Sequence, residues 1–275
     1  MSLPQAFWGN LGRRVLTALV ALPPLLAALF LGPPVLGVVV VASAVLVGLG
    51  EFFRLAAVRV PPMRFTGLLL AGALFVDVAY PGGRHPPIWP LAALLLLSLT
   101  LLPGRDLSLT VPSAAVTLLG AVYLGALGGT IAALRVVEPV GDGAWRVVLL
   151  LAIVMVSDTL AFFAGRAFGR RRLAPALSPG KTVEGALGGL VGGVSGAFGV
   201  RALGLPILPP WHTLVLGLLV AALGIVGDLD ESLLKRWAGV KDSGTLFPGH
   251  GGMLDRLDAL LFGAPILYYY FLYVS

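Results

Sequence analysis

Long apolar segments separated by short polar ones make up most of this 275-residue chain. A hydrocarbon core about 30 Å thick is crossed by roughly 20 helical residues, and a transmembrane strand would instead show short segments of alternating polarity. The pattern therefore predicts an all-α polytopic membrane protein with about nine transmembrane helices, although eight or ten also fit. The predicted spans are Val15–Leu31, Pro34–Gly50, Phe65–Tyr80, Ile88–Leu102, Val111–Leu134, Val147–Phe168, Ala186–Leu203, Trp211–Gly227 and Leu257–Val274.

Composition supports this class and removes several kinds of chemistry. Hydrophobic residues make up 58% of the chain and charged residues 12%, whereas about 25% of a soluble domain is charged. The absence of cysteine excludes disulfides, thiolate catalysis and Cys-ligated metals. The three histidines, His85, His212 and His250, argue against a His-rich zinc site.

The distribution of positive charge predicts the orientation. With a cytoplasmic N-terminus and nine spans, all but four of the 19 Lys and Arg residues fall in cytoplasmic segments, the four being Arg84, Arg135, Arg146 and Arg201. Basic residues favour the cytoplasmic side of membrane proteins, so this topology explains the net charge of +6 without a nucleic-acid partner. The loops 169–185 and 228–258 then face the cytoplasm.

We predict one integral membrane domain over residues 1–275 with two unequal halves. Residues 1–135 carry little chemistry, whereas residues 147–275 hold both basic loops and most carboxylates. The seventh predicted span repeats glycine at i, i+4, as in Gly185/Gly189 and Gly192/Gly196. This spacing lets helices approach closely. It favours packing inside the protomer, with a homodimer interface as the alternative.

The segment Gly227–Asp258, here called the signature segment, holds six carboxylates between two apolar runs. Charge wedged between membrane spans is costly unless it has a function. If helical geometry continues past Asp228, Ser232 and Lys235 share its face, and Asp255 and Asp258 share another at i, i+3. A glycine-rich loop lies between these helical stretches and would bring Asp228 and Asp255 together.

Carboxylates ringed by cations suggest a Mg²⁺ site that also holds phosphates. Mg²⁺ is usually bound by one or two carboxylates together with phosphate oxygens and water. The neighbouring cations that would neutralise phosphate are Lys235, Arg236, Lys241 and Arg256. The alternative is an ordinary juxtamembrane loop whose charges are paired and solvated.

The order of residues in the signature segment resembles that of the phosphatidate cytidylyltransferases, the CDP-diacylglycerol synthases. Their pattern is S-x-x-K-R, four residues, K-D, a Gly/Pro-rich stretch and H-G-G-x-x-D-R-x-D. Every specified position is matched here, by Ser232, Lys235, Arg236, Lys241, Asp242, His250, Gly251, Gly252, Asp255, Arg256 and Asp258. A pattern of this length with so many fixed polar positions is highly specific.

A second resemblance to the same family lies upstream, in its pattern D-x-x-A-[YF]-x-x-G-R-x-F-G followed by S-P-x-K-T-x-E-G. The matching polar residues are Asp158, Arg166, Ser178, Lys181, Thr182 and Glu184. The family usually has Lys where this chain has Gly180, so one cation is missing. The resemblance covers residues from about 150 to 275, and the first half matches in hydropathy and in its Arg-rich entry to the first span. A Walker A interpretation of the Ser178–Thr182 run fails, because Pro175 stands where that motif needs glycine.

The resemblance implies transfer of CMP from CTP to phosphatidic acid in the bacterial cytoplasmic membrane, giving CDP-diacylglycerol and pyrophosphate in phospholipid biosynthesis. It implies Mg²⁺, with a monovalent cation such as K⁺ as a second ion. Asp228 and Asp255 are the expected metal ligands, with Asp258 as a third candidate.

The resemblance also implies roles for the remaining residues. The four cations should contact phosphates of CTP or lipid, and Asp242 belongs to the same catalytic set. Ser232 either bonds a phosphate or caps a helix, and His250 either donates to pyrophosphate or orders its loop. A polar pocket for substrate is expected from Asp158, Arg166, Ser178, Lys181, Thr182 and Glu184.

Two other classes of function are alternatives to this one. A different CTP-dependent membrane lipid enzyme, such as a CDP-archaeol synthase or a polyprenol kinase, shares the logic of a nucleotide site at the membrane. An ion-coupled transporter would suit Asp158 and Asp77 within spans, but it predicts scattered carboxylates and inverted repeats. The charge in this chain is instead concentrated on one face.

Overall fold

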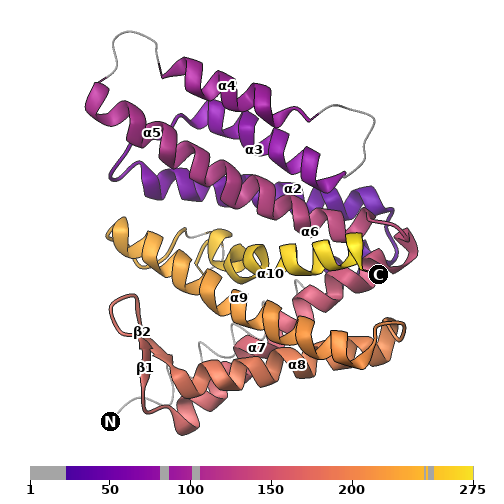
Figure 1. Cartoon of the computed structure of the whole chain (residues 1–275). Helices are drawn as coiled ribbons and strands as arrows, with labels where there is room; N and C mark the ends of the chain where they lie inside the picture. Colours follow the sequence, from indigo (N-terminus) through magenta and orange to yellow (C-terminus); the bar gives the residue numbers. More distant parts are fainter. Residues whose placement is uncertain (1–22, 81–86, 101–105, 245, 247–250, 275) are drawn as a thin grey trace.

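The structure is a computed structural model that describes residues 23–80, 87–100, 106–244, 246 and 251–274. Helices predominate throughout these ranges (Figure 1). The elements are α2 (Pro34–Ala56), α3 (Arg64–Ala79), α4 (Trp89–Leu99), α5 (Leu107–Gly120), π-helical η1 (Ala121–Ala126), α6 (Leu127–Val136), 3₁₀-helical η2 (Val140–Asp142), α7 (Gly143–Phe168), β1 (Arg172–Ala174), β2 (Ser178–Thr182), α8 (Val183–Gly204), α9 (Pro210–Trp237) and α10 (Leu254–Tyr273). Residues 23–30 are also helical, and the start of the first predicted span lies outside the described residues.

The helices form two groups with α10 between them (Figure 1). Helices α2 to α6, the N-terminal half, lie on one side, and α7, α8 and α9 lie on the other. Helix α10 contacts α9 and α7 as well as α6 and α2. The last helix of the chain therefore joins the two groups, and its first two turns carry Asp255 and Asp258.

The protein is a helical membrane protein, as the hydropathy pattern predicted. Within the described ranges, five helical stretches are long and apolar enough to cross a bilayer, namely Pro34–Ala56, Ser108–Val136, Val140–Phe168, Val183–Gly204 and Pro210–Trp237. Large apolar side chains face outward on several helices, including Leu91, Val111 and Val191. Such surfaces suit a lipid solvent. The number of spans and the orientation remain predictions.

Two helices differ from the predicted spans in instructive ways. Helix α9 continues to Trp237, whereas the predicted span ended at Gly227. Hydropathy marks where the apolar surface ends, but charged residues such as Lys and Glu are good helix formers. The predicted span Val111–Leu134 lies within one helical stretch, Ser108–Val136, in which the π-helical η1 connects α5 to α6.

A short β-hairpin corrects the all-α prediction. Strands β1 and β2 pair antiparallel within the segment 169–185, with Arg172 opposite Thr182 and Ala174 opposite Ser178. The Glu184 carboxylate accepts hydrogen bonds from the backbone N–H groups of Arg170, at 3.0 Å, and Arg171. Glu184 thus fixes the entry of the hairpin against the start of α8.

The glycine repeat of α8 packs against α7, as predicted for a role inside the protomer. A Cβ at Gly192 would lie 2.6 Å from the carbonyl oxygen of Val156, and one at Gly196 would lie 2.7 Å from that of Ala152. Side chains at these positions would push the two helices apart. The alternative role, in a homodimer, remains a prediction.

Candidate active site

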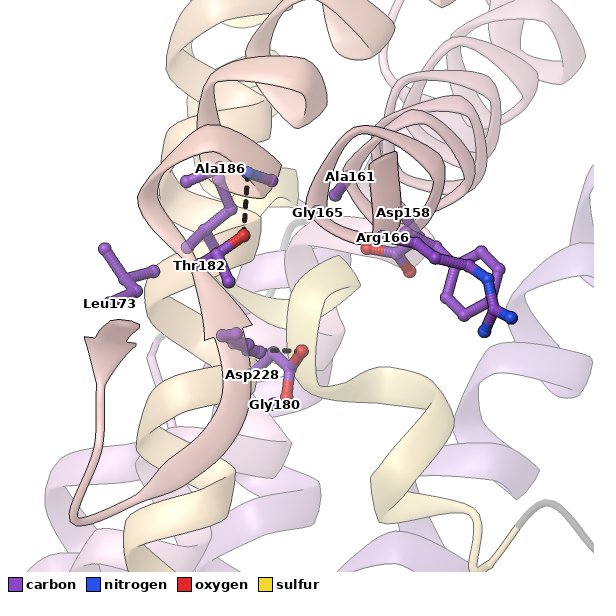
Figure 2. A pocket seen from close by; sticks show the side chains of 13 residues that line it. Asp158, Ala161, Gly165, Arg166, Leu173, Gly180, Thr182, Ala186 and Asp228 are labelled. Atoms are coloured by element: carbon purple, nitrogen blue, oxygen red, sulfur yellow. Dashed lines mark hydrogen bonds and ion pairs between the residues drawn. The ribbon is translucent and has the colours of Figure 1, made fainter. Parts of the chain in front are cut away.

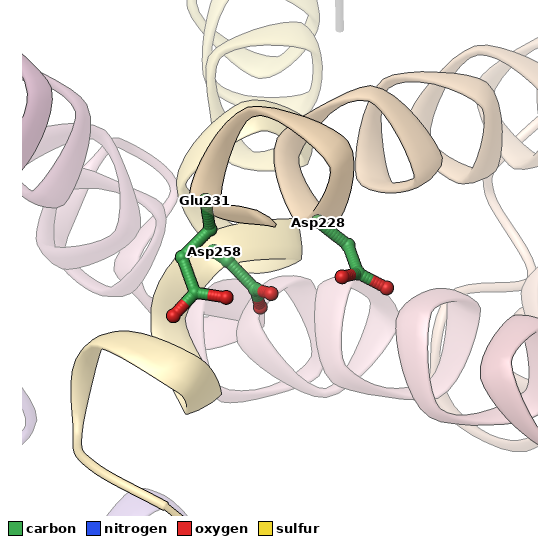
Figure 3. A group of neighbouring side chains, drawn as sticks. All are labelled: Asp228, Glu231 and Asp258. Atoms are coloured by element: carbon green, nitrogen blue, oxygen red, sulfur yellow. The ribbon is translucent and has the colours of Figure 1, made fainter. Parts of the chain in front are cut away.

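Three carboxylates meet where α9 and α10 lie side by side (Figure 3). Asp228 and Glu231 come from α9, Asp258 comes from α10, and one oxygen from each lies within 4.8 Å of the others. We call this set the acidic cluster. Glu231 is 1% exposed, and its Oε1 has no hydrogen-bond partner among the described residues. Buried carboxylates this close repel one another unless a cation lies among them.

The donor set of the acidic cluster fits a hard divalent cation. Carboxylate oxygens from three residues are the ligand type that Mg²⁺ prefers, and Mg²⁺ usually keeps further positions for water and phosphate. The Asp228 side chain is 40% exposed, which leaves one side of the cluster accessible. The unpaired oxygen of Glu231 is a second feature that a bound cation would satisfy.

A cavity of about 400 Å³ opens beside the acidic cluster (Figure 2). Its walls come from α7, the hairpin, α8 and α9. The polar residues that line it are Asp158, Arg166, Lys181, Thr182 and Asp228. This volume lies within the range of about 300–1,000 Å³ that is typical of small-molecule sites. Asp228 belongs to both the cavity and the cluster, so a ligand in the cavity reaches the carboxylates.

An ion pair joins the two segments that resemble the family patterns. The Lys181 ammonium, at the end of the hairpin, lies 2.5 Å from the Asp228 carboxylate on α9. Thr182 caps α8 by accepting a hydrogen bond from the Gly185 N–H at 3.1 Å. That cap fixes the residue beside Lys181 and hence the direction in which the lysine leaves the strand.

Asp158 and Arg166 reach the cavity from α7, and Figure 2 shows both side chains at its wall. Asp158 lies within a helix of 26 residues that is otherwise apolar over most of its length. A carboxylate inside a membrane helix is a functional candidate when it faces a polar cavity. Asp158, Arg166, Lys181 and Thr182 all line this cavity, and their predicted role in binding substrate remains a prediction.

Lys235 connects the acidic cluster to Asp255. Its ammonium lies 2.5 Å from the Glu231 carboxylate and 2.6 Å from Oδ1 of Asp255. Oδ2 of Asp255 accepts hydrogen bonds from the Ser243 hydroxyl at 2.7 Å and from the Gly252 N–H at 2.7 Å. Gly251 has a φ of +78°, a conformation that glycine adopts readily and that lets the chain turn toward Asp255.

Asp255 therefore organises the signature segment through its own contacts. All of the donors named above come from within residues 235–252. Metal binding by Asp255 remains a prediction. Its Oδ1 already contacts Lys235 and its Oδ2 already contacts Ser243 and Gly252, so a metal ion would be a further partner of one of these oxygens.

The other residues of the signature segment have more varied surroundings. Ser232 is buried on α9, and Arg236 donates to the carbonyl oxygen of Leu177 at 3.2 Å, which ties α9 to the hairpin. Lys241 and Asp242 are exposed in the segment after α9. His250 lies outside the described residues.

Two predicted residues lie toward the edges of this region. Arg256 is exposed on α10, where it lines the end of an apolar cavity of about 210 Å³ with Met253 and Leu257. Ser178 begins β2 and is half-buried. Neither residue lines the polar cavity.

Sequence reasoning missed two carboxylates. Glu231 follows Asp228 at i+3, so the same helical-face argument that selected Ser232 and Lys235 could have found it. Glu51, on α2, is 1% exposed and contacts the signature segment from the N-terminal half. A single acidic residue at the end of an apolar run gives no comparable sequence signal.

Comparison with known proteins gives a consistent result. A sequence profile described as the Cytidylyltransferase family matches residues 12–274. A phosphatidate cytidylyltransferase of Haemophilus influenzae is 30% identical over 96% of this chain and 99% of its own length. A protein of the same name from Synechocystis is 32% identical over 94% and 95%. One from Thermotoga maritima is 44% identical over 47% of this chain and 50% of its own length.

Proposed function

Because the chain belongs to the cytidylyltransferase family and is a nucleotidyltransferase, we propose that it transfers CMP from CTP to phosphatidic acid with the help of Mg²⁺. The products are CDP-diacylglycerol and pyrophosphate. The observation that carries the proposal is the contact between Lys181 and Asp228 at the cavity wall. This contact joins the two segments that resemble the family's patterns, although Lys181 and Asp228 are 47 positions apart in the chain (228 − 181 = 47).

The reaction needs alignment and charge neutralisation more than a base. A phosphate oxygen of the lipid forms a bond to the α-phosphorus of CTP, and the bond from that phosphorus to the bridging oxygen breaks. Pyrophosphate leaves with the bonding electrons. The lipid phosphate is already ionised at neutral pH, so the barrier lies in bringing two anions together and in stabilising the leaving group.

The acidic cluster is the proposed metal site. Asp228, Glu231 and Asp258 would hold Mg²⁺, with Asp255 as a further candidate ligand and K⁺ as a candidate second ion. A bound divalent ion supplies positive charge against the phosphates and the leaving pyrophosphate. Asp228 lies between this cluster and the cavity, so the nucleotide phosphates belong at that boundary.

The cations around the cavity would hold the nucleotide phosphates. Lys181 pairs with Asp228 in the free protein and would exchange this carboxylate for phosphate oxygens. Arg166 lines the same wall and adds a guanidinium suited to bidentate phosphate contacts. Lys235 keeps Glu231 and Asp255 at a fixed separation, which holds the cluster in shape.

Arg256 suits the lipid substrate. It lies on α10 two residues before Asp258 and lines the apolar cavity beside Leu257 and Leu260. An anionic headgroup bound there would have its apolar chains on the side of the membrane helices. We further propose that the acidic cluster faces the cytoplasm of a bacterial cell, where CTP is available, as the distribution of Lys and Arg predicts.

The direct test is a detergent-micelle assay with CTP labelled at the α-phosphate, phosphatidic acid and Mg²⁺. We expect labelled CDP-diacylglycerol and pyrophosphate in equal amounts, and no product after chelation of the metal. Asp228→Asn and Asp255→Asn should be assayed in parallel. Loss of product in Asp228→Asn with retained folding is the result expected of a ligand at the cluster.

Other outcomes would change the assignment. Turnover of CTP with an isoprenoid lipid but not with phosphatidic acid would favour a CDP-archaeol synthase or polyprenol kinase. Product formation that is insensitive to chelation would contradict the metal site. A lack of CTP consumption with every lipid tested would contradict the proposed reaction.

A further inference from the structure

A buried carboxylate of the N-terminal half contacts the signature segment. Glu51 lies near the end of α2 and is 1% exposed. Its Oε2 accepts a hydrogen bond from the Leu254 N–H at 2.8 Å and lies 3.2 Å from the Ser243 hydroxyl oxygen. Both partners lie about 200 residues away in the chain. The nearest described cation is Arg54, 3.8 Å away and largely exposed.

The bond to Leu254 caps helix α10. Leu254 is the first residue of α10, and the N–H groups in a helix's first turn have no partner within the helix. The residue before it, Met253, makes no side-chain capping bond. The Glu51 carboxylate of α2 thus caps the N-terminus of α10, and its negative charge interacts favourably with the positive end of the helix dipole. Asp258 lies one turn further along α10, so the cap fixes the start of the helix that carries it.

The contact with Ser243 connects Glu51 to the acidic cluster through a series of polar contacts. The Ser243 hydroxyl is 2.7 Å from Oδ2 of Asp255, and Asp255 is bonded to Lys235. Lys235 in turn pairs with Glu231, a member of the acidic cluster. An unbroken series of polar contacts therefore leads from α2 to the carboxylates proposed to bind metal.

Two glycines leave room for Glu51 on the signature segment. A Cβ at Gly244 would collide with its Oε1, and a Cβ at Gly252 would collide with its Oε2. The backbone before and after the loop thus approaches the same carboxylate closely. This fit, together with the burial of Ser243 and Leu254, sets Glu51 apart from a solvated charge at a helix end.

We propose that Glu51 is a positioning residue for nucleotidyl transfer. It holds Ser243 and the start of α10 so that Asp258, Asp255 and Lys235 keep their places around the metal and the phosphates. The inference rests on the proposed function for its catalytic consequence, but the geometry it describes belongs to the protein without substrate.

The test compares Glu51→Ala and Glu51→Gln with a matched control, Thr117→Val. Thr117 is also a fully buried polar residue of the N-terminal half, and its hydroxyl accepts a bond from the Met63 N–H at 2.8 Å, away from the signature segment. Each protein is measured for Mn²⁺ affinity by electron paramagnetic resonance, for trypsin cleavage after the exposed Lys241, and for kcat at saturating CTP and Mg²⁺.

Hydrogen bonds to charged groups contribute about 1.5–3 kcal/mol, which corresponds to a factor of roughly 10 to 150. We therefore expect Glu51→Ala to weaken Mn²⁺ binding and to lower kcat by about tenfold or more. Cleavage after Lys241 should become faster. Glu51→Gln keeps one acceptor oxygen for Leu254 but loses the charge, so its effects should be intermediate. Thr117→Val should match the wild type in all three measurements.

The proposal would be overturned if Glu51→Ala and Glu51→Gln kept wild-type Mn²⁺ affinity, cleavage rate and kcat, even if they unfolded at a lower temperature. If Glu51→Ala does not fold, Glu51→Gln and Ser243→Ala carry the test, because Ser243→Ala removes the connection and leaves the carboxylate. A wild-type protein without CTP turnover would contradict the proposed function instead, while Mn²⁺ affinity and cleavage would still decide the role of Glu51.

Discussion

The two halves of this protein use buried polar groups differently. In the N-terminal half, Thr110, Thr117 and Thr130 donate to backbone carbonyls three or four residues earlier in their own helices. In the C-terminal half, Lys181, Asp228 and Asp258 meet across different elements. Locally satisfied groups are compatible with a purely structural role, whereas polar groups brought together from distant segments indicate a site. Glu51 belongs to the first half by sequence, but its carboxylate contacts the signature segment of the second half.

The largest loss of activity is expected when a carboxylate of the acidic cluster in the C-terminal half is removed. Asp258→Asn should lower kcat by about a thousandfold, since metal coordination contributes several kcal/mol to transition-state stabilisation. Asp228→Asn should behave alike. Both variants should unfold at the wild-type temperature or above it, because the change relieves repulsion between neighbouring carboxylates. Steady-state kinetics and thermal unfolding check both points.

Asp77→Asn is the matched control for these variants. Asp77 lies on α3 and accepts hydrogen bonds from the Ile88 and Trp89 N–H groups, far along the chain from the signature segment. We expect its kcat to stay within about twofold of wild type, since Asp77 is half-buried on α3 and does not line the polar cavity. Equal losses in Asp77→Asn and Asp258→Asn would show that the acidic cluster has no special role.

The next largest effect is expected at the hairpin. Lys181→Met removes the cation paired with Asp228 and should raise the KM for CTP, lowering kcat/KM by roughly 10- to 100-fold if the lysine contacts phosphate. Arg172→Met provides the control, because Arg172 is exposed on β1 and does not line the cavity. Kinetics at varied CTP check the prediction, and a KM that is equal in all three proteins would contradict a phosphate contact by Lys181.

A smaller loss of activity is expected when the packing of α8 against α7 is disrupted. Gly192→Leu places a side chain against the Val156 carbonyl of α7 and should destabilise the fold by about 1–3 kcal/mol. Activity should fall in parallel with unfolding, because α7 and α8 hold Asp158 and Thr182 on opposite sides of the cavity. Gly199→Leu, on the same helix, meets open space and should be tolerated. Thermal unfolding of the two variants tests this, and similar unfolding temperatures would contradict the packing account.

The smallest effect on catalysis is expected from Thr117→Val. The substitution leaves the buried Met63 N–H without its partner, at a cost of about 1–3 kcal/mol in the free energy of unfolding. The kcat at a temperature where the protein is folded should change by less than about twofold. A large loss of kcat without loss of stability would mean that the N-terminal half is coupled to the site by routes other than Glu51.

Sequence alone predicted the helical membrane class because hydropathy requires no tertiary information. The upstream resemblance fixed Asp158 and Lys181 by number, and both line the cavity, while their binding of substrate remains a prediction. Sequence reasoning placed the end of the apolar span at Gly227 and considered a helical continuation past Asp228, and α9 continues to Trp237. The hairpin was predicted only as a loop, because strands of three and five residues leave no clear pattern.

The position of Glu51 could not be predicted for a different reason. Its role depends on where α10 begins relative to α2, and such a contact across about 200 residues is set by packing and not by local pattern. The sequence predicted that Asp228 and Asp255 come together, whereas the carboxylates grouped with Asp228 are those of Glu231 and Asp258. Lys235 lies between Asp255 and Glu231, and Asp258 is the residue of α10 that joins Asp228.

The most direct test of the central claim is anomalous diffraction from crystals grown with Mn²⁺ and CTP. We predict an anomalous peak bonded to oxygens of Asp228 and Asp258, with Glu231 or Asp255 completing the protein ligands and the nucleotide phosphates toward Lys181. The same data would decide whether Asp255 is a ligand. A Mn²⁺ ion bound to CTP but away from the acidic cluster would contradict the account.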